Sequence, residues 1–95
     1  MGTLDGKVAI ITGAGQGLGA AHAKLFAAEG ARLVLNDLGD GVEDVVTEIN
    51  AGGGEAVANR TSVSDWNASQ EMIDQAVDTY GDLHILVNNA GILRD

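Results

Sequence analysis

Four glycines in the stretch TGAGQGLG, residues 12–19, are the residues whose type and spacing best fit a chemical role. Glycine inside a regular element is destabilising by roughly 0.5–1 kcal/mol relative to alanine, so such a dense cluster needs a reason. The stretch follows the apolar run VAII and precedes a helical pattern, which places it at a strand-to-helix turn. Backbone N–H groups and the positive end of the helix dipole converge at such a turn, which predicts an anion site.

The spacing of these glycines points to a dinucleotide as the anion. Gly13 can make the tight turn, Gly17 leaves no side chain between the backbone and a pyrophosphate, and Gly19 lets the helix press against the sheet. Gly15, Gly17 and Ala20 also match the G-x-G-x-x-G/A fingerprint, and both interpretations predict the same ligand. The alternative is a tight turn that binds nothing.

An acidic residue stands where a dinucleotide site needs one. Asp37 ends the second apolar run, 20 positions after Gly17 (37 minus 17), where a carboxylate can accept hydrogen bonds from adenosine ribose hydroxyls. This carboxylate would repel a 2′-phosphate, and neither Gln16 nor Leu38 supplies a compensating positive charge. We therefore expect NAD rather than NADP. The alternatives for Asp37 are a solvated loop carboxylate and a helix N-cap.

Four short apolar runs predict the strands that position these residues. They cover residues 7–12, 32–37, 55–60 and 83–89. The first, second and fourth are apolar enough to be covered on both faces, as strands of a parallel sheet are.

Helical patterns separate the runs. The first covers about residues 17–29, the second is centred on residues 42–49, and the third opens with Ser64 or Asp65 as N-cap. Glycines at positions 30, 52–54 and 81 end them. The residues expected to face the core are Leu18, Ala21, Leu25 and Phe26 in the first helix, Val42, Val45, Val46 and Ile49 in the second, and Ile73, Ala76, Val77 and Tyr80 in the third.

The strict alternation of strands and helices predicts an α/β fold. Right-handed βαβ crossovers produce a parallel sheet, so we expect a Rossmann-like, doubly wound βαβαβαβ unit with strand order 3-2-1-4. The cofactor would cross the switch point between strands 1 and 4. With no proline and no shift in composition, residues 1–95 are expected to form a single dinucleotide-binding domain.

Composition excludes several other classes of protein. Fourteen acidic and five basic residues give a net charge of −9, which argues against nucleic acid and anionic membrane surfaces as partners. The absence of cysteine removes disulfides and thiolate metal sites, and we predict no metal ligands. The only apolar run near the N-terminus is too short for a signal peptide or a membrane span, so a cytoplasmic protein is expected.

Two motifs together resemble one enzyme family. TGAGQGLG resembles the TGxxxGxG cofactor loop of short-chain dehydrogenases/reductases, and NNAG at 88–91 resembles the motif after their fourth strand. The resemblance runs from about Lys7 to the end of the chain. VLNDLG and NNAGILRD look most like the (3R)-hydroxyacyl-CoA dehydrogenase segments of peroxisomal multifunctional enzymes and their bacterial relatives.

The resemblance implies a set of cofactor-binding residues. Where many members carry an Asp-Val pair that recognises adenine, this chain has Ser62 and Val63, which leaves a hydroxyl in place of the carboxylate. The asparagines of NNAG have an alternative role, tying strand ends together through backbone hydrogen bonds. The implied cofactor contacts are Gly13, Gln16, Gly17, Leu18, Gly19, Asp37, Ser62, Val63, Asn89, Ala90 and Gly91.

No catalytic residue is expected within this chain. The family places its catalytic Asn, Ser and Tyr-x-x-x-Lys beyond the fourth strand, and the sequence stops at Asp95, so we expect the chain to be truncated before the catalytic half. Tyr80 is followed four residues later by His84 rather than lysine, and we reject it as the general acid/base. His22 and His84 are expected to be packed side chains, and Trp66 to cover an edge of the core.

Three functions remain open on the sequence alone. The favoured one is the NAD-binding part of an oxidoreductase that transfers a hydride between the nicotinamide cofactor and an alcohol or ketone, 3-hydroxyacyl-CoA being the class that the resemblance suggests. The second is a stand-alone nucleotide-binding or self-assembling module, a homo-oligomer formed through the edge of the fourth strand or an uncovered face. The third is a methyltransferase, which TGAGQGLG followed by NNAG argues against.

Overall fold

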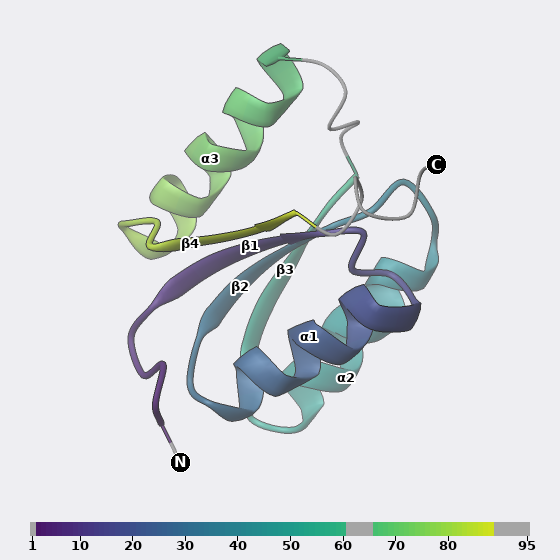
Figure 1. The fold of residues 1–95 in the computed structure, drawn as a ribbon, viewed down its shortest axis with the longest axis vertical. Helices are drawn as coiled ribbons and strands as arrows, with labels where there is room; N and C mark the ends of the chain where they lie inside the picture. Colours follow the sequence, from purple (N-terminus) through teal and green to yellow (C-terminus); the bar gives the residue numbers. More distant parts are fainter. Residues whose placement is uncertain (1, 61–65, 89–95) are drawn as a thin grey trace.

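Strands and helices alternate along the chain in the computed structural model, which describes residues 2–60 and 66–88 (Figure 1). Each predicted element is present, within one or two residues of the expected bounds at most ends. The elements are β1 (Val8–Thr12), α1 (Gly17–Ala28), β2 (Arg32–Asn36), α2 (Gly41–Ala51), β3 (Glu55–Asn59), α3 (Trp66–Tyr80) and β4 (Ile85–Asn88).

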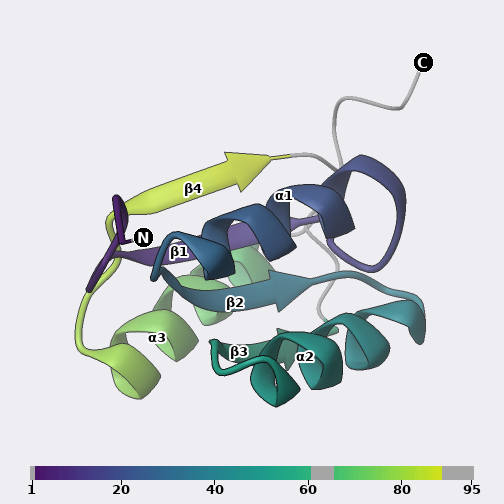
Figure 2. The ribbon, with the colours of Figure 1, turned by 90° about the horizontal axis from the view of Figure 1, so that it is seen from below.

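The four strands form one parallel sheet in the order β3-β2-β1-β4, as the sequence predicted. In the central register, Ile10 of β1 lies between Val34 of β2 and Leu86 of β4. Helices α1 and α2 cover one face of the sheet and α3 lies on the other (Figures 1 and 2). All strands therefore end at one edge, where the turns into α1 and α2 also lie.

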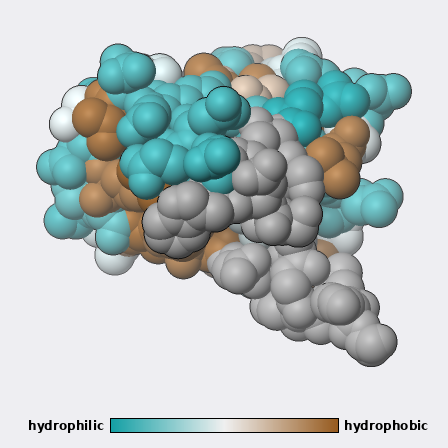
Figure 3. All heavy atoms as spheres, turned by 90° about the horizontal axis from the view of Figure 1, so that it is seen from above, coloured by the Kyte–Doolittle hydropathy of each residue, from teal (hydrophilic) through white to brown (hydrophobic). Residues whose placement is uncertain are grey.

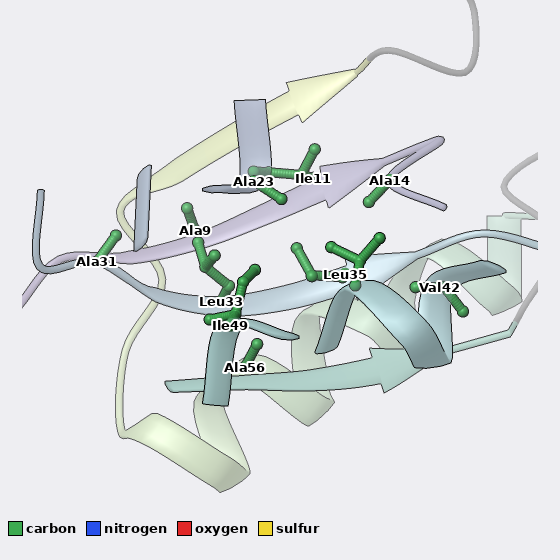
Figure 4. Packing of buried hydrophobic residues seen from close by; sticks show 11 residues of the cluster. Ala9, Ile11, Ala14, Ala23, Ala31, Leu33, Leu35, Val42, Ile49 and Ala56 are labelled. Carbon is green, nitrogen blue, oxygen red and sulfur yellow. The ribbon is translucent and has the colours of Figure 1, made fainter. Parts of the chain in front are cut away.

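The central strands β1 and β2 are buried between two apolar clusters. On one face, Ala9 and Ile11 of β1 and Leu33 and Leu35 of β2 pack beneath α1 and α2, and Ile11 lies beside Ala23 in Figure 4. The intervening residues of the same strands pack beneath α3, with Met72 and Ala76. Each large aliphatic side chain buried in this way contributes about 1.5–3 kcal/mol to stability.

Helix α1 faces the sheet with a different stripe from the predicted one. Leu18 and Leu25 are both 57% exposed, and Ala21 is exposed as well. The buried residues are Gly19 and Ala23, and of the predicted set only Phe26 is partly buried in the core. Small residues at these positions bring the helix axis close to the sheet, which turns the larger leucines outward. The prediction for Leu18, Ala21 and Leu25 was wrong.

The other two helices follow their predicted stripes more closely. In α2, Val42, Val45 and Ile49 are buried, and Val46 packs against them. In α3, Ala76 is buried and Ile73 and Tyr80 are partly buried, whereas Val77 is 44% exposed and Met72 takes the buried position instead. The expected N-cap, Ser64 or Asp65, lies outside the described residues, as does the packing of the Trp66 side chain.

The fourth strand is not covered on both faces, which corrects the prediction. Leu86, in the middle of β4, is 58% exposed, because α3 packs against β1 and β2 and leaves this part of the sheet uncovered. Figure 3, which looks onto the α3 side of the molecule, shows hydrophobic areas among the hydrophilic residues of this face. Among the described residues, β4 has a neighbouring strand on one side only.

Candidate functional site

The glycine-rich stretch forms the turn between β1 and α1, as predicted. Gly13 and Gly17 have φ angles of +64° and +59°, in the left-handed region where glycine has no steric penalty. Between them, Gln16 is the N-cap of α1 in an extended conformation, with φ −165° and ψ 170°. The two left-handed residues let the chain reverse from the strand and enter the helix within four residues.

Gly19 sits where no side chain can be accommodated. A Cβ atom at this position would overlap the carbonyl group of Gly13, and the Gly19 backbone is buried. The first turn of α1 therefore packs directly against the glycine turn that precedes it. The sequence predicted that Gly19 lets α1 pack closely against the sheet. In the structure, Gly19 also packs closely against the glycine turn.

The first turn of α1 has no acidic side chain of its own. In the described part of the chain, the Gln16 side chain makes no capping hydrogen bond. The first N–H groups of a helix have no partner within the helix and carry the positive end of its dipole. Gly17 borders this terminus, and a Cβ built on it would meet no atom within 4 Å. The arrangement can bind a phosphate group through its backbone.

Asp37 lies at the end of β2, beside the glycine turn. Its Oδ2 accepts a hydrogen bond from the N–H of Gly15 at 2.8 Å, and its Oδ1 accepts one from the N–H of Gly39 at 3.0 Å. The N-cap of α2 is Asp40, so Asp37 does not cap that helix. Asp37 is a partly buried loop carboxylate whose two oxygens accept one N–H from the β1–α1 turn and one from its own loop. The Asp37 carboxylate therefore lies directly beside the glycine turn.

Two features near Asp37 were missed by the sequence analysis. Arg60, directly after β3, donates from Nη2 to the carbonyl of Leu38 at 3.2 Å and pairs with Asp40 at 2.8 Å. Asn59 accepts the N–H of Asp37 on its carbonyl oxygen at 3.1 Å and a hydrogen bond from the Asn36 amide on its Oδ1 at 2.8 Å. The available signal was their position at the end of a strand that lies next to β2.

The ends of β1 and β4 meet at the predicted switch point. The Thr12 hydroxyl, buried at the end of β1, donates to the carbonyl of Val87 at 3.3 Å. The remaining predicted contacts, Ser62, Val63, Asn89, Ala90 and Gly91, lie outside the described residues. The structure therefore brings together Gly13, Gln16, Gly17, Leu18, Gly19 and Asp37 at one edge of the sheet.

The rejected catalytic candidates lie at the opposite edge. The Tyr80 hydroxyl donates to the carbonyl of Leu33, near the start of β2, and burial followed by the nearby Glu55 carboxylate raises the Tyr80 pKa. His84 precedes β4 rather than lying inside it, and its Nδ1 accepts the N–H of Val8 at 2.9 Å. Both side chains tie the amino ends of strands to α3 and its following loop.

The described ranges hold neither a metal site nor a membrane-spanning helix. Residues 2–60 and 66–88 contain no cluster of three or more potential metal ligands. In the same ranges, no helix combines the length and the apolar character needed to cross a bilayer.

Comparison with known families matches residues 7–95 to the short chain dehydrogenase family. Among curated proteins, peroxisomal multifunctional enzyme type 2 of Drosophila melanogaster is 50% identical over 101 residues, which cover 96% of this chain and 16% of that protein. Oxidoreductase UcpA of Salmonella typhimurium is 43% identical, and the match covers 99% of this chain and 36% of UcpA. The chain thus spans well under half the length of these relatives.

Solved structures give the same result for the fold. A short chain dehydrogenase from Mycobacterium avium superposes with a TM-score of 0.93 at 51% identity, over 99% of this chain and 37% of that one. A short chain dehydrogenase/reductase from Burkholderia phymatum in complex with NAD has a TM-score of 0.85 at 40% identity, covering 90% of this chain and 31% of that one. A metagenomic short-chain oxidoreductase in complex with NADP has a TM-score of 0.81 at 34% identity, covering 87% and 38%.

Proposed function

Since this chain belongs to the short chain dehydrogenase family, whose match runs over residues 7–95, we propose that it is the NAD-binding part of such an oxidoreductase. The observation that carries the proposal is the β1–α1 turn. Its two left-handed glycines lead into a helix N-terminus without acidic residues, and a carboxylate stands beside it at the end of the neighbouring strand. A nicotinamide dinucleotide needs this combination of a phosphate site and a ribose acceptor.

The residues present fit the cofactor at both of its anchoring groups. The backbone from Gly13 to Gly19 would hold the pyrophosphate, because its N–H groups and the α1 dipole face a region that Gly17 leaves open. The Asp37 carboxylate would hold the adenosine ribose, since each of its oxygens retains a lone pair after accepting one N–H. When bound, the nicotinamide ring supplies hydride donor or acceptor chemistry for an alcohol or ketone, with 3-hydroxyacyl-CoA as the proposed class.

The choice of NAD over NADP rests on local charge. A 2′-phosphate next to Asp37 would meet a carboxylate, and the neighbouring Arg60 is already paired with Asp40 at 2.8 Å and lies 3.8 Å from Glu43. The family includes a member solved with NAD and one solved with NADP, so membership alone does not select the cofactor. The uncompensated carboxylate supports NAD.

Calorimetric titration of the 95-residue chain with NAD and NADP tests the proposal. We expect saturable binding that favours NAD. Asp37→Ala should weaken NAD binding by roughly 1.5–3 kcal/mol, the typical contribution of a hydrogen bond to a charged group, and narrow the preference over NADP. Asp44→Ala removes an equal charge from an exposed position and is the matched control. A folded chain that binds neither cofactor would contradict the proposal.

We further propose that the chain self-associates through β4. Leu86 is 58% exposed, and β4 has an open edge within the described residues, a combination that favours pairing with another chain. The net charge of −9 opposes association, so it should strengthen as salt screens that charge. Sedimentation velocity at rising concentration and salt should show dimers or larger species, and Leu86→Glu should abolish them. A monomer under all conditions would exclude this surface.

A further inference from the structure

The first half of the glycine turn is held by the end of β2. The N–H of Ala14 donates to the carbonyl of Asn36 at 2.9 Å, and the N–H of Gly15 donates to Asp37 Oδ2 at 2.8 Å. One of these bonds joins backbone to backbone and persists whatever side chain is at position 37. The other depends on a side chain, and that side chain is the proposed ribose acceptor.

The Gly15 peptide is enclosed as well as bonded. A Cβ atom on Gly15 would stand 2.7 Å from Asp37 Oδ2 and 3.1 Å from the N of Val42. A Cβ atom on Gly41 would stand 2.6 Å from the carbonyl oxygen of Gly15. The Asp37 carboxylate, the Gly15 peptide and the start of α2 therefore pack together without space for an extra methyl group.

The backbone that carries Asp37 is itself anchored. Its N–H donates to the carbonyl of Asn59 at 3.1 Å, and the carbonyl of the next residue, Leu38, accepts a hydrogen bond from Arg60 at 3.2 Å. The second carboxylate oxygen accepts the N–H of Gly39 at 3.0 Å, which orients the side chain. An anchored, oriented carboxylate can hold a neighbouring loop in position.

We propose that Asp37 is a positioning residue for the phosphate-binding turn, in addition to its proposed contact with ribose. The carboxylate holds the Gly15 peptide so that the turn presents its following N–H groups at the start of α1. This inference rests on the proposed function, because it concerns the turn that would bind the pyrophosphate. It makes recognition of the phosphates depend on the same side chain that recognises the sugar.

A nucleotide without ribose hydroxyls separates the two roles. ADP and 2′,3′-dideoxy-ADP are titrated by calorimetry into the wild-type chain and into Asp37→Ala. If Asp37 bound only ribose, the variant would bind the dideoxy nucleotide as well as the wild type does, or better, because a negative charge has been removed. We expect instead that the variant binds dideoxy-ADP at least fivefold more weakly than the wild type.

Two further variants control for charge and shape. Asp44→Ala removes an exposed carboxylate in the first turn of α2 and should leave dideoxy-ADP binding within twofold of the wild type. Asp37→Asn keeps one acceptor oxygen and should restore part of the affinity that Asp37→Ala loses. If Asp37→Ala does not fold, as judged by circular dichroism, the comparison of Asp37→Asn with the wild type decides the question.

Hydrogen exchange measures the positioning role without any ligand. In Asp37→Ala the Gly15 amide should exchange at least tenfold faster than in the wild type. In Asp37→Asn, which keeps one acceptor oxygen and is the variant to use if Asp37→Ala does not fold, the increase should be smaller and at least threefold. The Ala14 amide, bonded to the Asn36 carbonyl, should change little. Unchanged Gly15 exchange together with unchanged dideoxy-ADP binding would overturn the inference. A wild-type chain that binds no nucleotide would remove the proposed function, and the exchange result would still show whether Asp37 holds the turn.

Discussion

Helices α1 and α2 begin at the same edge of the sheet and cover the same face, yet the charges in their first turns differ (Figure 2). The first turn of α2 contains Glu43 and Asp44, and Asp40 occupies its N-cap. The first turn of α1 contains no acidic residue, and its N-cap is the uncharged Gln16. Neither N-cap side chain makes a capping hydrogen bond within the described residues, so the two helix ends differ in charge and not in capping. The two helix dipoles are of the same kind, and only one is offset by the protein's own carboxylates.

The acidic residues stabilise the N-terminus of α2, whereas the N-terminus of α1 is left suited to binding an anion. Acidic residues in the first turn typically stabilise a helix by about 0.3–1 kcal/mol, and α1 forgoes this contribution. Its first turn instead packs against the Gly13 carbonyl through Gly19, and its first N–H groups have no partner within the helix. A negatively charged ligand would supply the missing compensation.

Gly19→Ala should have the largest effect on this arrangement. The new methyl group would overlap the Gly13 carbonyl, so α1 or the turn must move, and overpacking of this kind costs about 1–3 kcal/mol or more. Urea denaturation should show the loss of stability, and NAD binding should fall below detection. The control is Gly39→Ala in the β2–α2 turn, where the methyl group would lie 3.7 Å from Asp37 Oδ1. If Gly19→Ala and Gly39→Ala lower stability and NAD affinity equally, the contact between Gly19 and the Gly13 carbonyl is not the cause of the loss.

Gly17→Ala tests the conformation of the turn rather than its packing. Nothing lies within 4 Å of a Cβ at this position, so the expected cost, roughly 1–2 kcal/mol, comes only from the left-handed backbone at φ +59°. Gly17→Asn should recover part of the loss, because asparagine tolerates this region. Gly52→Ala, at the end of α2 with φ −87°, should instead leave stability unchanged or raise it. Thermal or urea unfolding of the three variants makes the comparison.

Gln16→Asp would make the start of α1 resemble that of α2. A capping carboxylate should stabilise the chain by on the order of 1 kcal/mol, and it should weaken NAD binding by about the same amount through repulsion of the pyrophosphate. Stability and affinity would then change in opposite directions. Gln16→Asn, which caps without charge, should gain similar stability and lose less affinity. If Gln16→Asp leaves the NAD affinity measured by calorimetry unchanged, the pyrophosphate does not bind at the N-terminus of α1.

Much of the fold could be predicted from the sequence because the strands and α2 carry large apolar residues at clear periods. Helix α1 could not be oriented in this way. Its sheet-facing residues include Gly19 and Ala23, and small residues give little periodic signal, whereas the exposed Leu18 and Leu25 give a strong one. The close packing at Gly19 determines which side of α1 faces the sheet. The periodic spacing of apolar residues in the sequence does not reveal such packing.

The candidate site was predictable where residue type alone restricts the backbone. Gly13 and Gly17 stand at left-handed positions, which few other residues adopt, so their spacing carried the prediction. The contacts of Asp37 with Gly15 and the approach of Arg60 to Leu38 depend on which strands are neighbours and in which register. That information arises only when β1, β2 and β3 are aligned.

Arg60→Gln should have the smallest effect on stability and NAD affinity. Arg60 contacts the turn that leads into α2. Arg60 pairs with Asp40 at 2.8 Å, but the two side chains are 42% and 98% exposed, so the pair should contribute under about 1 kcal/mol and less at high salt. Removing it would also release the Leu38 carbonyl and leave Asp40 without this pairing in the turn that follows Asp37. We therefore expect NAD affinity to fall a few-fold by calorimetry.

Lys24→Gln is the matched control for this last prediction. Lys24 of α1 pairs with Glu48 of α2 at 3.2 Å, with side chains 47% and 63% exposed, and this pair lies away from the turns. Its loss should lower stability about as much as the loss of Arg60 and leave NAD affinity unchanged. If the two variants lower affinity equally, the effect comes from total charge, because each removes one cation from a chain of net charge −9. If only Arg60→Gln does, the turn into α2 helps to hold the carboxylate side of the cofactor site while the turn into α1 holds the phosphates.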